Sequence, residues 1–400
     1  MNLHSDYPFW LVKEGVLTDY PRLQQDTETG ALIIGGGISG ALIGHELAKR
    51  RIASIIVDKR HIGFGSTSSS TALLQYEIDN PLHRLSGEIG EARAVRSFEL
   101  GVEAIDKLGA VCDRILGKAD FRRRPSLWYA SYAKDVKETI GPEFRARKRA
   151  GFDVRLLGED DVRRTFGFAA PAAILSRAGA TCHPYKLTDA LLRDFKRMGG
   201  RVYDLTRVVG WSETKTRIEV TTAGGPRIRA RHVIVAAGYE TQGFLDRRVT
   251  SFHSTYAIAS KPGGPRDPWH RNAMIWETKT PYLYLRTASD GRIFVGGRDE
   301  EFSDPRKRDA LIGRKSRQLL ADFRRLFPDV PFEIDFAWAG TFGETRDGLP
   351  YIGTAGSKRV YYAMGYGGNG ITFSIVAADM IADALTGKKN RDAPLFGFDR

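Results

Sequence analysis

The 400-residue chain has little cysteine, and its two residues of this type, Cys112 and Cys182, lie far apart in the sequence. Neither belongs to a CxxC pair or to another spacing that is typical of metal ligands. This scarcity argues against a disulfide framework and against a zinc site as the basis of the fold. We expect two buried free thiols and no bound metal.

The N-terminal part also lacks an apolar run of membrane-spanning length. The uncharged stretch at residues 30–44 is shorter than the roughly 18 apolar residues that a spanning helix needs, and several glycines interrupt it. Asp26 and Glu28 precede this stretch, where a signal peptide would carry basic residues. The sequence therefore predicts no membrane span and a cytoplasmic location.

Acidic residues are outnumbered by basic ones, 48 against 61, which gives a formal net charge of +13. Such an excess can mark a nucleic-acid partner, a membrane surface or an acidic substrate. The basic residues are scattered, however, with modest clusters at residues 122–124 and 145–149. We interpret the excess as a solvated surface and keep a nucleic-acid partner as the less favoured alternative.

The sequence does contain a complete nucleotide-binding pattern near its N-terminus. Residues 31–34 are typical of a buried strand, and they lead into Gly-Gly-Gly-Ile-Ser-Gly at residues 35–40. A helical stretch at 41–51 and a second buried strand at 52–57 follow, and Asp58 ends that strand. Because all these parts occur in order, the segment predicts a dinucleotide site, although it does not distinguish NAD from FAD.

Each part of this segment has a physical task. Gly35 permits the turn, Gly37 lets the backbone approach a pyrophosphate, and Gly40 lets the helix pack closely on the strand. The amide groups at the helix start hold phosphate, and Asp58 can accept hydrogen bonds from ribose hydroxyls. The residues predicted here to bind the cofactor are Gly35, Gly37, Ile38, Ser39, Gly40, Asp58 and Lys59.

Three later segments favour FAD. One is a loop of glycine and hydroxyl residues at 63–72, and another is a buried strand that ends in small residues at 231–238, with an upstream strand near Val208. The third, at 361–381, reads as strand, glycine loop and helix, whose positive end could face a flavin ring. The residues predicted to bind FAD in these segments are Gly65, Ser66, Thr67, Ser68, Thr71, Ala72, Val208, Ala237, Gly238, Gly367, Gly368, Asn369, Gly370, Ile371 and Thr372.

From about Trp10 to the C-terminus the chain resembles a known family. The resemblance rests on the segments above, on Val-Gly-Gly-Arg at 295–298 and on Thr-Arg-Asp-Gly-Leu-Pro-Tyr-Ile-Gly at 345–353. Together they resemble the D-amino-acid oxidase (DAO) class of FAD-dependent oxidoreductases, which includes sarcosine, glycine and gamma-glutamylputrescine oxidases. The resemblance is specific for the superfamily and much less so for the member.

The resemblance implies an α/β chain, α+β overall, in which a glutathione-reductase-like FAD-binding Rossmann domain is interleaved with an antiparallel-sheet substrate domain. The FAD domain would take residues 25–85, 150–240 and 336–395, after an N-terminal extension at 1–24. The substrate domain would take 86–149 and 241–335. From the residues themselves we expect a hairpin around an Asp-Gly turn at 282–296 and a packing helix at 91–108.

Departures from better-known relatives bear on the cofactor and on the electron acceptor. The flavin-linked cysteine of sarcosine oxidase corresponds to Gly340, which predicts non-covalent FAD. The oxygen-activating lysine of that enzyme corresponds to Phe294. Electrons would therefore pass to oxygen or to another acceptor, and the sequence leaves oxidase and dehydrogenase open.

The cations that hold a substrate carboxylate in those relatives are also replaced. Their positions correspond to Thr372 and Asn369 for sarcosine oxidase, and to Phe342 and Gly368 for glycine oxidase. A simple α-amino acid is then disfavoured unless Arg286 or Arg298 takes over. The predicted catalytic and pocket residues are Arg298, Phe342, Tyr366 and Asn369, with Trp338, Tyr256, Trp276, Tyr282 and Tyr284 as further candidates for the pocket wall or the core.

We expect a small amine, such as a polyamine derivative, to be oxidised by hydride transfer to the flavin. Two alternatives stay open at this point. One is a flavoprotein that acts on modified tRNA, which would need a contiguous cationic face beside the flavin opening. The other is a non-catalytic subunit that keeps FAD for structural reasons.

Overall fold

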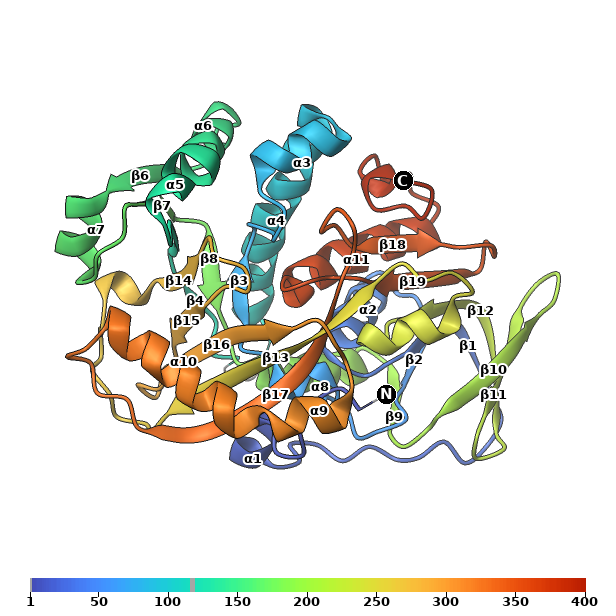
Figure 1. Ribbon diagram of the computed structural model, residues 1–400. Coiled ribbons are helices and arrows are strands. Elements are labelled where there is room, and N and C mark those ends of the chain that lie inside the picture. Colours follow the sequence, from blue (N-terminus) through green and yellow to red (C-terminus); the bar gives the residue numbers. More distant parts are fainter. Residues whose placement is uncertain (1, 116–118) are drawn as a thin grey trace.

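Two eight-stranded sheets and one three-stranded sheet organise the chain in the computed structural model, which describes residues 2–115 and 119–400 (Figure 1). Residue 1 and residues 116–118, which fall within the predicted extension and substrate domain, lie outside the described part. The combination of a parallel and an antiparallel sheet confirms the predicted fold class.

The first sheet contains the predicted nucleotide-binding strands. Its central strands β1, β2, β9, β12 and β19 pair in parallel, while β10, β11 and β18 join as antiparallel neighbours. The strands are β1 (Thr27–Ile34), β2 (Ser54–Val57), β9 (Arg201–Tyr203), β10 (Val208–Glu213), β11 (Ile218–Thr222), β12 (Arg227–Val235), β18 (Tyr351–Thr354) and β19 (Val360–Met364). Residues 31–34 of β1 and all of β2 are buried, as expected for strands covered on two sides.

The second sheet is antiparallel except where β14 pairs with β5, and its order is β17-β13-β16-β15-β14-β5-β7-β6. Its strands are β5 (Ser126–Tyr129), β6 (Val154–Gly158), β7 (Ala172–Ser176), β13 (Ser251–Ser260), β14 (Met274–Glu277), β15 (Tyr284–Thr287), β16 (Ile293–Glu300) and β17 (Ile334–Glu344). The predicted hairpin is confirmed as β15 and β16, with Leu285 opposite Val295. The small sheet holds β3 (Leu73–Gln75), β4 (Arg122–Arg123) and β8 (Gly179–Thr181).

Helices cover the sheets and link them. The α-helices are α1 (Phe9–Glu14), α2 (Ile38–Lys49), α3 (Leu82–Ile89), α4 (Glu91–Cys112), α5 (Ala133–Asp135), α6 (Gly141–Arg149), α7 (Glu159–Phe166), α8 (Pro184–Arg197), α9 (Pro305–Ala310), α10 (Ile312–Leu326) and α11 (Gly370–Leu385). Shorter helical turns are η1 (Ser66–Ser69), η2 (Val136–Ile140), η3 (Gly238–Phe244), η4 (His270–Asn272) and η5 (Ala393–Leu395). Helix α2 packs between α8 and α11 on one face of the first sheet, and α10 packs on β13, β16 and β17 of the second.

The sheets do not follow the predicted domain boundaries at residues 150 and 336. Strands β6, β7 and β17 pair within the second sheet, although their residues were predicted to belong to the FAD domain. Helix α4, predicted in the substrate domain, shares a core with α2 and α11 through Phe98 and Ile105. The partners of a strand or helix depend on long-range register and packing, which local sequence patterns do not record.

The N-terminal segment, which was predicted to be an extension, pairs with the second sheet. The amide of Ser5 donates to the carbonyl of Ala339, and the amide of Thr341 donates to the carbonyl of Leu3. Residues 3–5 therefore run along the edge of β17. Leu3 also lines the cavity described below.

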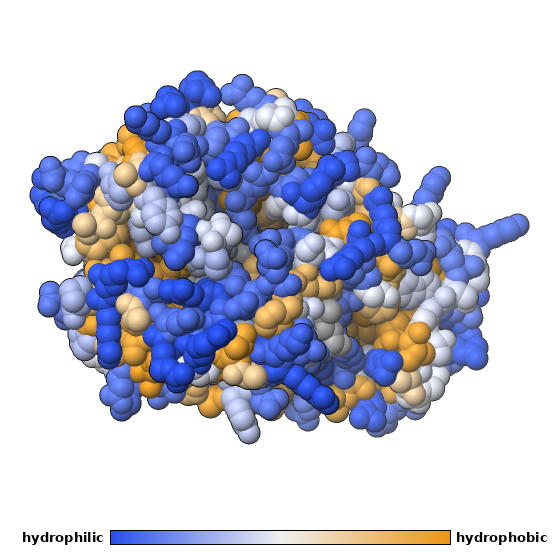
Figure 2. Space-filling model, viewed as in Figure 1, coloured by the Kyte–Doolittle hydropathy of each residue, from blue (hydrophilic) through white to orange (hydrophobic). Residues whose placement is uncertain are grey.

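The basic residues are dispersed among acidic partners. Hydrophilic side chains cover most of the face in Figure 2, where hydrophobic side chains form separate patches. Within the predicted clusters, Arg123 pairs with Asp106 at 2.6 Å, and Arg147 is fully buried. Within the described residues, none of the helices combines the length and apolarity that crossing a lipid bilayer requires.

Candidate active site

A cavity of about 830 Å³ is bordered by residues of both large sheets. Its volume lies within the range of roughly 300–1,000 Å³ that is common for small-molecule sites. The ends of β1 and β2, the start of α2, the loop before β3 and the start of α11 all contribute to its wall. Segments that are more than 300 residues apart therefore meet at one site.

The first glycine turn has the geometry that its sequence predicted. Gly35 has φ +114°, and a Cβ atom there would lie 2.3 Å from the carbonyl oxygen of Ala236. A Cβ atom on Gly40 would lie 1.8 Å from the carbonyl oxygen of Gly35. Both positions therefore require glycine, and the turn brings Gly37, Ile38 and Ser39 to the cavity wall.

The hydroxyl-rich loop crosses in front of this helix start. Thr67 Oγ1 accepts a hydrogen bond from the amide of Ile38 at 3.0 Å. Ser66 Oγ is buried, lines the cavity and has no hydrogen-bond partner. A buried hydroxyl without a partner beside a helix N-terminus fits the phosphates of a dinucleotide, because both groups can donate to anionic oxygens.

Asp58 lies at the same end of the cavity. Its Oδ2 accepts from the amide of Gly36 at 2.7 Å, and its Oδ1 accepts from the amide of Arg60 at 2.8 Å. Burial raises the pKa of Asp58 to about 6, and these amides oppose part of that rise. Each oxygen keeps a second lone pair for a ribose hydroxyl. Lys59, Val208, Ala237 and Gly238 also line the cavity, and Lys59 pairs with Glu240 at 2.7 Å.

The second glycine turn reaches the same cavity from the other end of the chain. Gly367, Gly368, Asn369, Gly370 and Ile371 line the wall where α11 begins. The hydroxyls of Ser39 and Ser374, which lie near the starts of α2 and α11, share a hydrogen bond of 2.7 Å. The two helix starts are therefore held against one another, as Figure 1 shows for the helices themselves.

Asn369 has a positioning task in this turn. Its Nδ2 donates to the carbonyl oxygens of Gln75 at 2.9 Å and of Glu77 at 2.8 Å. The amide nitrogen is thus committed to the segment after β3. Only the Oδ1 atom of Asn369 is left for the predicted catalytic role, and otherwise the residue maintains the shape of the turn.

Three predicted cofactor residues do not line the cavity. Gly40 is turned toward Gly35 and serves the close packing described above. The hydroxyl of Ser68 donates to the carbonyl of Gly65 at 2.8 Å, and that of Thr372 donates to the carbonyl of Gln75 at 3.2 Å. Local hydrogen bonds to the backbone satisfy both hydroxyls and turn them away from the cavity.

Arg298, the predicted pocket cation, also lies outside the cavity lining, and this prediction was wrong. Its guanidinium makes a bidentate pair with Asp322 of α10, at 2.7 and 2.6 Å. The cause is a β-bulge, since Arg298 has φ +60° and the pairing of β13 with β16 shifts between Tyr256 and Ser254. The bulge places Asp299, not Arg298, on the cavity wall.

Arg286 does not take over as a cavity cation either. Its side chain is 2% exposed, lies outside the cavity lining and donates to the carbonyl oxygens of Thr71, Cys182 and Thr287. Burial lowers its pKa to about 10. Phe294 lies 4.7 Å from this guanidinium and is fully buried.

The rings of the aromatic candidates, apart from that of Tyr256, do line the cavity. Phe342 and Tyr366 face it, and Trp338 also donates from Nε1 to the carbonyl of Ser69 at 2.9 Å. Phe252, Trp276, Tyr282 and Tyr284 line the cavity from the second sheet and its loops, whereas the ring of Tyr256 packs against α10 on the other face of that sheet. These rings make an apolar wall that can exclude water from a reacting group.

The sequence analysis missed the acidic side of this cavity. Asp79 and Asp299 both line it, and neither was singled out. A strand-and-loop alternation after β3 could have indicated Asp79, since Glu77 and Asp79 share one side of an extended segment. No local signal indicated Asp299, because the bulge reverses the alternation there.

Asp299 gives a test of this geometry. Burial and the nearby Asp79 carboxylate raise the pKa of Asp299 to about 7. Between about pH 4 and pH 7 the folded chain keeps a proton that the unfolded chain has lost, so the side chain lowers stability as pH rises. We expect Asp299→Asn to raise the free energy of unfolding by about 1–2 kcal/mol at pH 8 and to change it little at pH 4. Chemical denaturation at both pH values measures this, and the exposed Glu301→Gln is the control.

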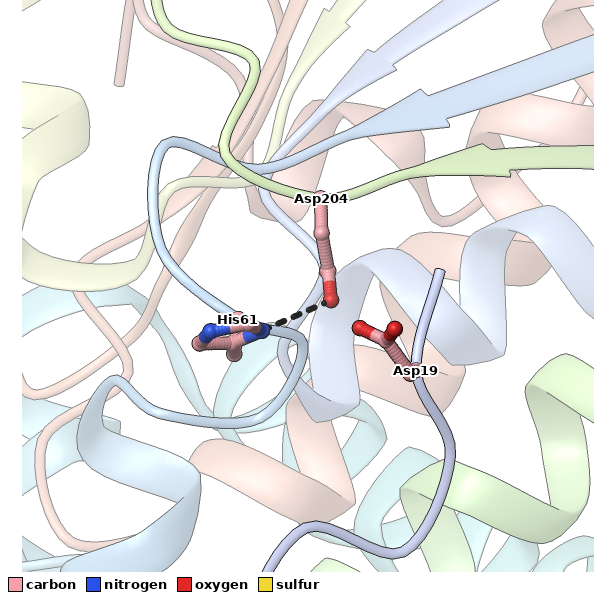
Figure 3. Close-up of side chains that lie close together, drawn as sticks. All are labelled: Asp19, His61 and Asp204. Atoms are coloured by element: carbon pink, nitrogen blue, oxygen red, sulfur yellow. Dashed lines mark hydrogen bonds and ion pairs between the residues drawn. The ribbon is translucent and has the colours of Figure 1, made fainter. Parts of the chain in front are cut away.

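A second group of titratable side chains lies apart from the cavity lining. Asp19, His61 and Asp204 bring one ligand atom each to within 4.8 Å of one another (Figure 3). Asp204 Oδ2 is 3.1 Å from His61 Nδ1, and Asp204 Oδ1 accepts from the amide of Ile62 at 2.9 Å. These bonds tie the loop after β2 to the end of β9, and we assign the group this structural task.

Comparisons with known proteins agree with this site. A family model described as DAO, FAD dependent oxidoreductase, matches residues 31–384. The gamma-glutamylputrescine oxidoreductase of Escherichia coli is 25% identical over 389 residues, covering 93% of this chain and 87% of that protein. The glycine oxidase of Bacillus licheniformis is 26% identical over 368 residues, covering 89% and 92%. The crystal structure of glycine oxidase from Geobacillus kaustophilus superposes with a TM-score of 0.76 at 19% identity, covering 91% and 96%.

Proposed function

Because the chain belongs to the DAO family of FAD-dependent oxidoreductases, we propose that it holds FAD non-covalently in the cavity and oxidises an amine or amino-acid derivative at its CH–NH group. The supporting observation is that two glycine-rich helix starts, at Gly37 and Asn369, border the same cavity. A single nucleotide site needs one such start, whereas a long dinucleotide with a flavin at one end can use both.

Successive parts of the cavity wall suit the ribose, the pyrophosphate and the flavin ring of FAD. The Asp58 carboxylate suits the ribose, and the start of α2 with Ser66 suits the pyrophosphate. The start of α11 suits the flavin ring, because its amides and its positive dipole favour electron density there. Neither cysteine lines the cavity, and Gly340 stands where a flavin-linked cysteine would be, which supports non-covalent binding.

Bound FAD supplies the hydride acceptor for this reaction. The amine loses a hydride from the carbon beside its nitrogen, the nitrogen lone pair forms a C=N bond, and water hydrolyses the product after release. The protein has to position the C–H bond and exclude competing water, which the rings of Phe342, Tyr366 and Tyr282 can do. Oxygen or another electron acceptor completes the turnover.

The test is to mix the purified yellow protein with a panel of amines and amino acids under anaerobic conditions. The absorbance of the flavin near 450 nm is then measured for each mixture. We expect at least one amine to bleach the flavin, and admission of air then separates an oxidase from a dehydrogenase. A protein that stays yellow with every member of the panel would contradict the proposed activity. The cytoplasmic location, the amine itself and the lack of a nucleic-acid partner stay predictions.

Non-covalent binding has a direct test of its own. Acid precipitation of the holoprotein should release all of the flavin into the supernatant, because no side chain is bonded to the ring. The double variant Cys112→Ser, Cys182→Ser should carry as much flavin as the parent. Yellow colour that stays in the pellet would show a covalent link and refute this part of the proposal.

A further inference from the structure

Charge is distributed unequally along the cavity. The cations on its wall are Lys59, Arg60 and Arg207, and all three belong to the end formed by β2 and β10. At the opposite end, where the glycine turn before α11 meets the second sheet, the charged residues on the wall are Glu77, Asp79 and Asp299. Within the described lining, the end away from the nucleotide strands is therefore acidic.

Asp79 lies beside the second glycine turn. A Cβ atom on Gly367 would lie 3.4 Å from Asp79 Oδ2, and the amide of Gly368 and the hydroxyl of Tyr282 both donate to this carboxylate. The side chain is exposed at the cavity wall, yet so much protein surrounds it that burial raises its pKa. Asp79 is thus fixed in place next to the turn that Asn369 anchors.

Asp299 faces the same end of the cavity from the bulge of β16. The hydroxyl of Thr255 donates to its carboxylate, while Oδ1 is buried and has no hydrogen-bond partner. Buried polar atoms rarely remain unpaired, so this oxygen indicates a ligand group that can donate a hydrogen bond.

Among the described residues, no cation forms an ion pair with Asp79 or Asp299, although Lys315 acts on Asp299 from a greater distance. Glu77 is paired with Arg147 at 3.3 Å, and Lys315 behind the sheet is paired with Glu300 at 2.5 Å. Burial raises the pKa values of Asp79 and Asp299, and the Asp79 carboxylate adds to the rise at Asp299. A cation placed between the carboxylates would remove this cost.

Aromatic rings complete the surroundings of this acidic end. Tyr282, Tyr284 and Tyr239 line the cavity beside the two aspartates, and the pKa of each hydroxyl is raised by burial, so the rings stay neutral. Neutral electron-rich faces attract ammonium groups. A carboxylate at this place would instead meet two carboxylates of like charge and no cation.

We propose that the substrate is a diamine or polyamine without a carboxylate, whose distal ammonium group binds between Asp79 and Asp299 beneath Tyr282. This inference rests on the proposed function, since the other nitrogen is the one that is oxidised. The distal ammonium donates to Oδ1 of Asp299 and to the Asp79 carboxylate. Charge at the distal end, rather than the reacting amine, then sets the specificity.

Three probes with four carbon atoms each separate charge from size. The distal end is a positive ammonium group in 1,4-diaminobutane, an uncharged methyl group in butylamine and a negative carboxylate in 4-aminobutanoate. We expect kcat/KM for anaerobic flavin reduction to fall at least tenfold from the first to the second and further to the third. Diamines of two to six carbons extend the series to find the length that fits. A preference for 4-aminobutanoate or another amino acid would overturn the inference and leave the proposed function standing.

The variants Asp79→Asn and Asp299→Asn test the two carboxylates, alone and together. The double variant should lose most of the advantage of the diamine over butylamine, through KM more than through kcat. Glu301→Gln removes the same charge from an exposed position two residues from Asp299 and should keep the parental ratio. A double variant that keeps this ratio but shifts the flavin spectrum would overturn the inference, since the aspartates would then serve the cofactor.

Binding without turnover separates the two proposals. Perturbation of the flavin spectrum by each probe, titrated at constant ionic strength, reports binding even when no electrons are transferred. If the diamine binds in an aspartate-dependent way but leaves the flavin oxidised, the ammonium site stands and the proposed oxidation of that amine fails. If the diamine neither binds nor reduces the flavin while another amine does, the ammonium site is refuted.

Discussion

Gly40→Ala should yield a protein that is purified without yellow colour. The added methyl group would lie 1.8 Å from the carbonyl oxygen and 3.0 Å from the carbonyl carbon of Gly35. Both atoms belong to the backbone of the turn that presents Gly37 to the cavity, so relief of the clash must displace the start of α2. Overpacking of this kind costs about 1–3 kcal/mol or more in stability, and the displaced amides would lose the phosphates as well.

The measurement is the ratio of flavin absorbance to protein absorbance, followed by titration of the stripped protein with FAD. We expect the dissociation constant for FAD to rise by about two orders of magnitude, which corresponds to roughly 3 kcal/mol. Gly87→Ala in α3 is the matched control, because a Cβ atom there meets nothing within 4 Å. That variant should bind FAD as the parent does and be more stable by about 0.5–1 kcal/mol. Undiminished FAD binding by Gly40→Ala would show that the turn does not hold the cofactor.

Arg147→Met should destabilise the folded protein by about 3–5 kcal/mol. Arg147 is 1% exposed, and its Nε donates to Glu143 at 2.7 Å while a terminal nitrogen lies 3.3 Å from Glu77. Glu143 also accepts from the amides of Leu82 and His83, so it anchors the start of α3. Removal of the arginine leaves the buried carboxylate of Glu77 without a cation and that of Glu143 with the His83 imidazole alone, which costs far more than the pair itself contributes.

The neighbouring Lys148→Met is the control, since Lys148 is exposed and the substitution should change stability by less than about 0.5 kcal/mol. Burial alone would raise the pKa of Glu143, but Arg147 and His83 outweigh it and hold this pKa at about 2. The stability that comes from this low pKa is complete above about pH 4.5 and is lost as pH falls toward 2. Urea denaturation between pH 7 and pH 3 should therefore show a steeper acid loss in the parent than in Arg147→Met. Equal stability of the two proteins at pH 7 would contradict the assignment.

Local patterns predicted those parts of the fold that local physics decides. The unit from β1 through the glycine turn to β2 follows from buried strands and from the steric demands of Gly35 and Gly40. Helix α2 begins at Ile38, earlier than the expected residue 41, because the last glycines of the motif already form its first turn. Helix α4 likewise follows from its apolar periodicity, whereas α11 is buried on nearly all sides and follows from its long apolar run.

The errors arose where distant segments decide the outcome. Arg298 was predicted as a pocket cation, but a bulge against β13 turns it away from the cavity and places Asp299 on the cavity wall. Membership of β6, β7 and β17 in the second sheet depends on pairing partners that no single segment reveals. The acidic end of the cavity was missed for the same reason, since Asp79 lies in the loop after β3 and Asp299 lies at the bulge of β16, far apart in the sequence.

The hydrogen bond between Ser39 and Ser374 has a consequence for biosynthesis. The first glycine turn leaves the ribosome early, but its partner on α11 is translated more than 300 residues later. A chain released before residues 370–385 are made would lack the wall that α11 contributes. Cofactor loading is therefore expected to follow completion of α11, and nascent chains truncated ahead of this helix should emerge colourless even when the first turn has already formed.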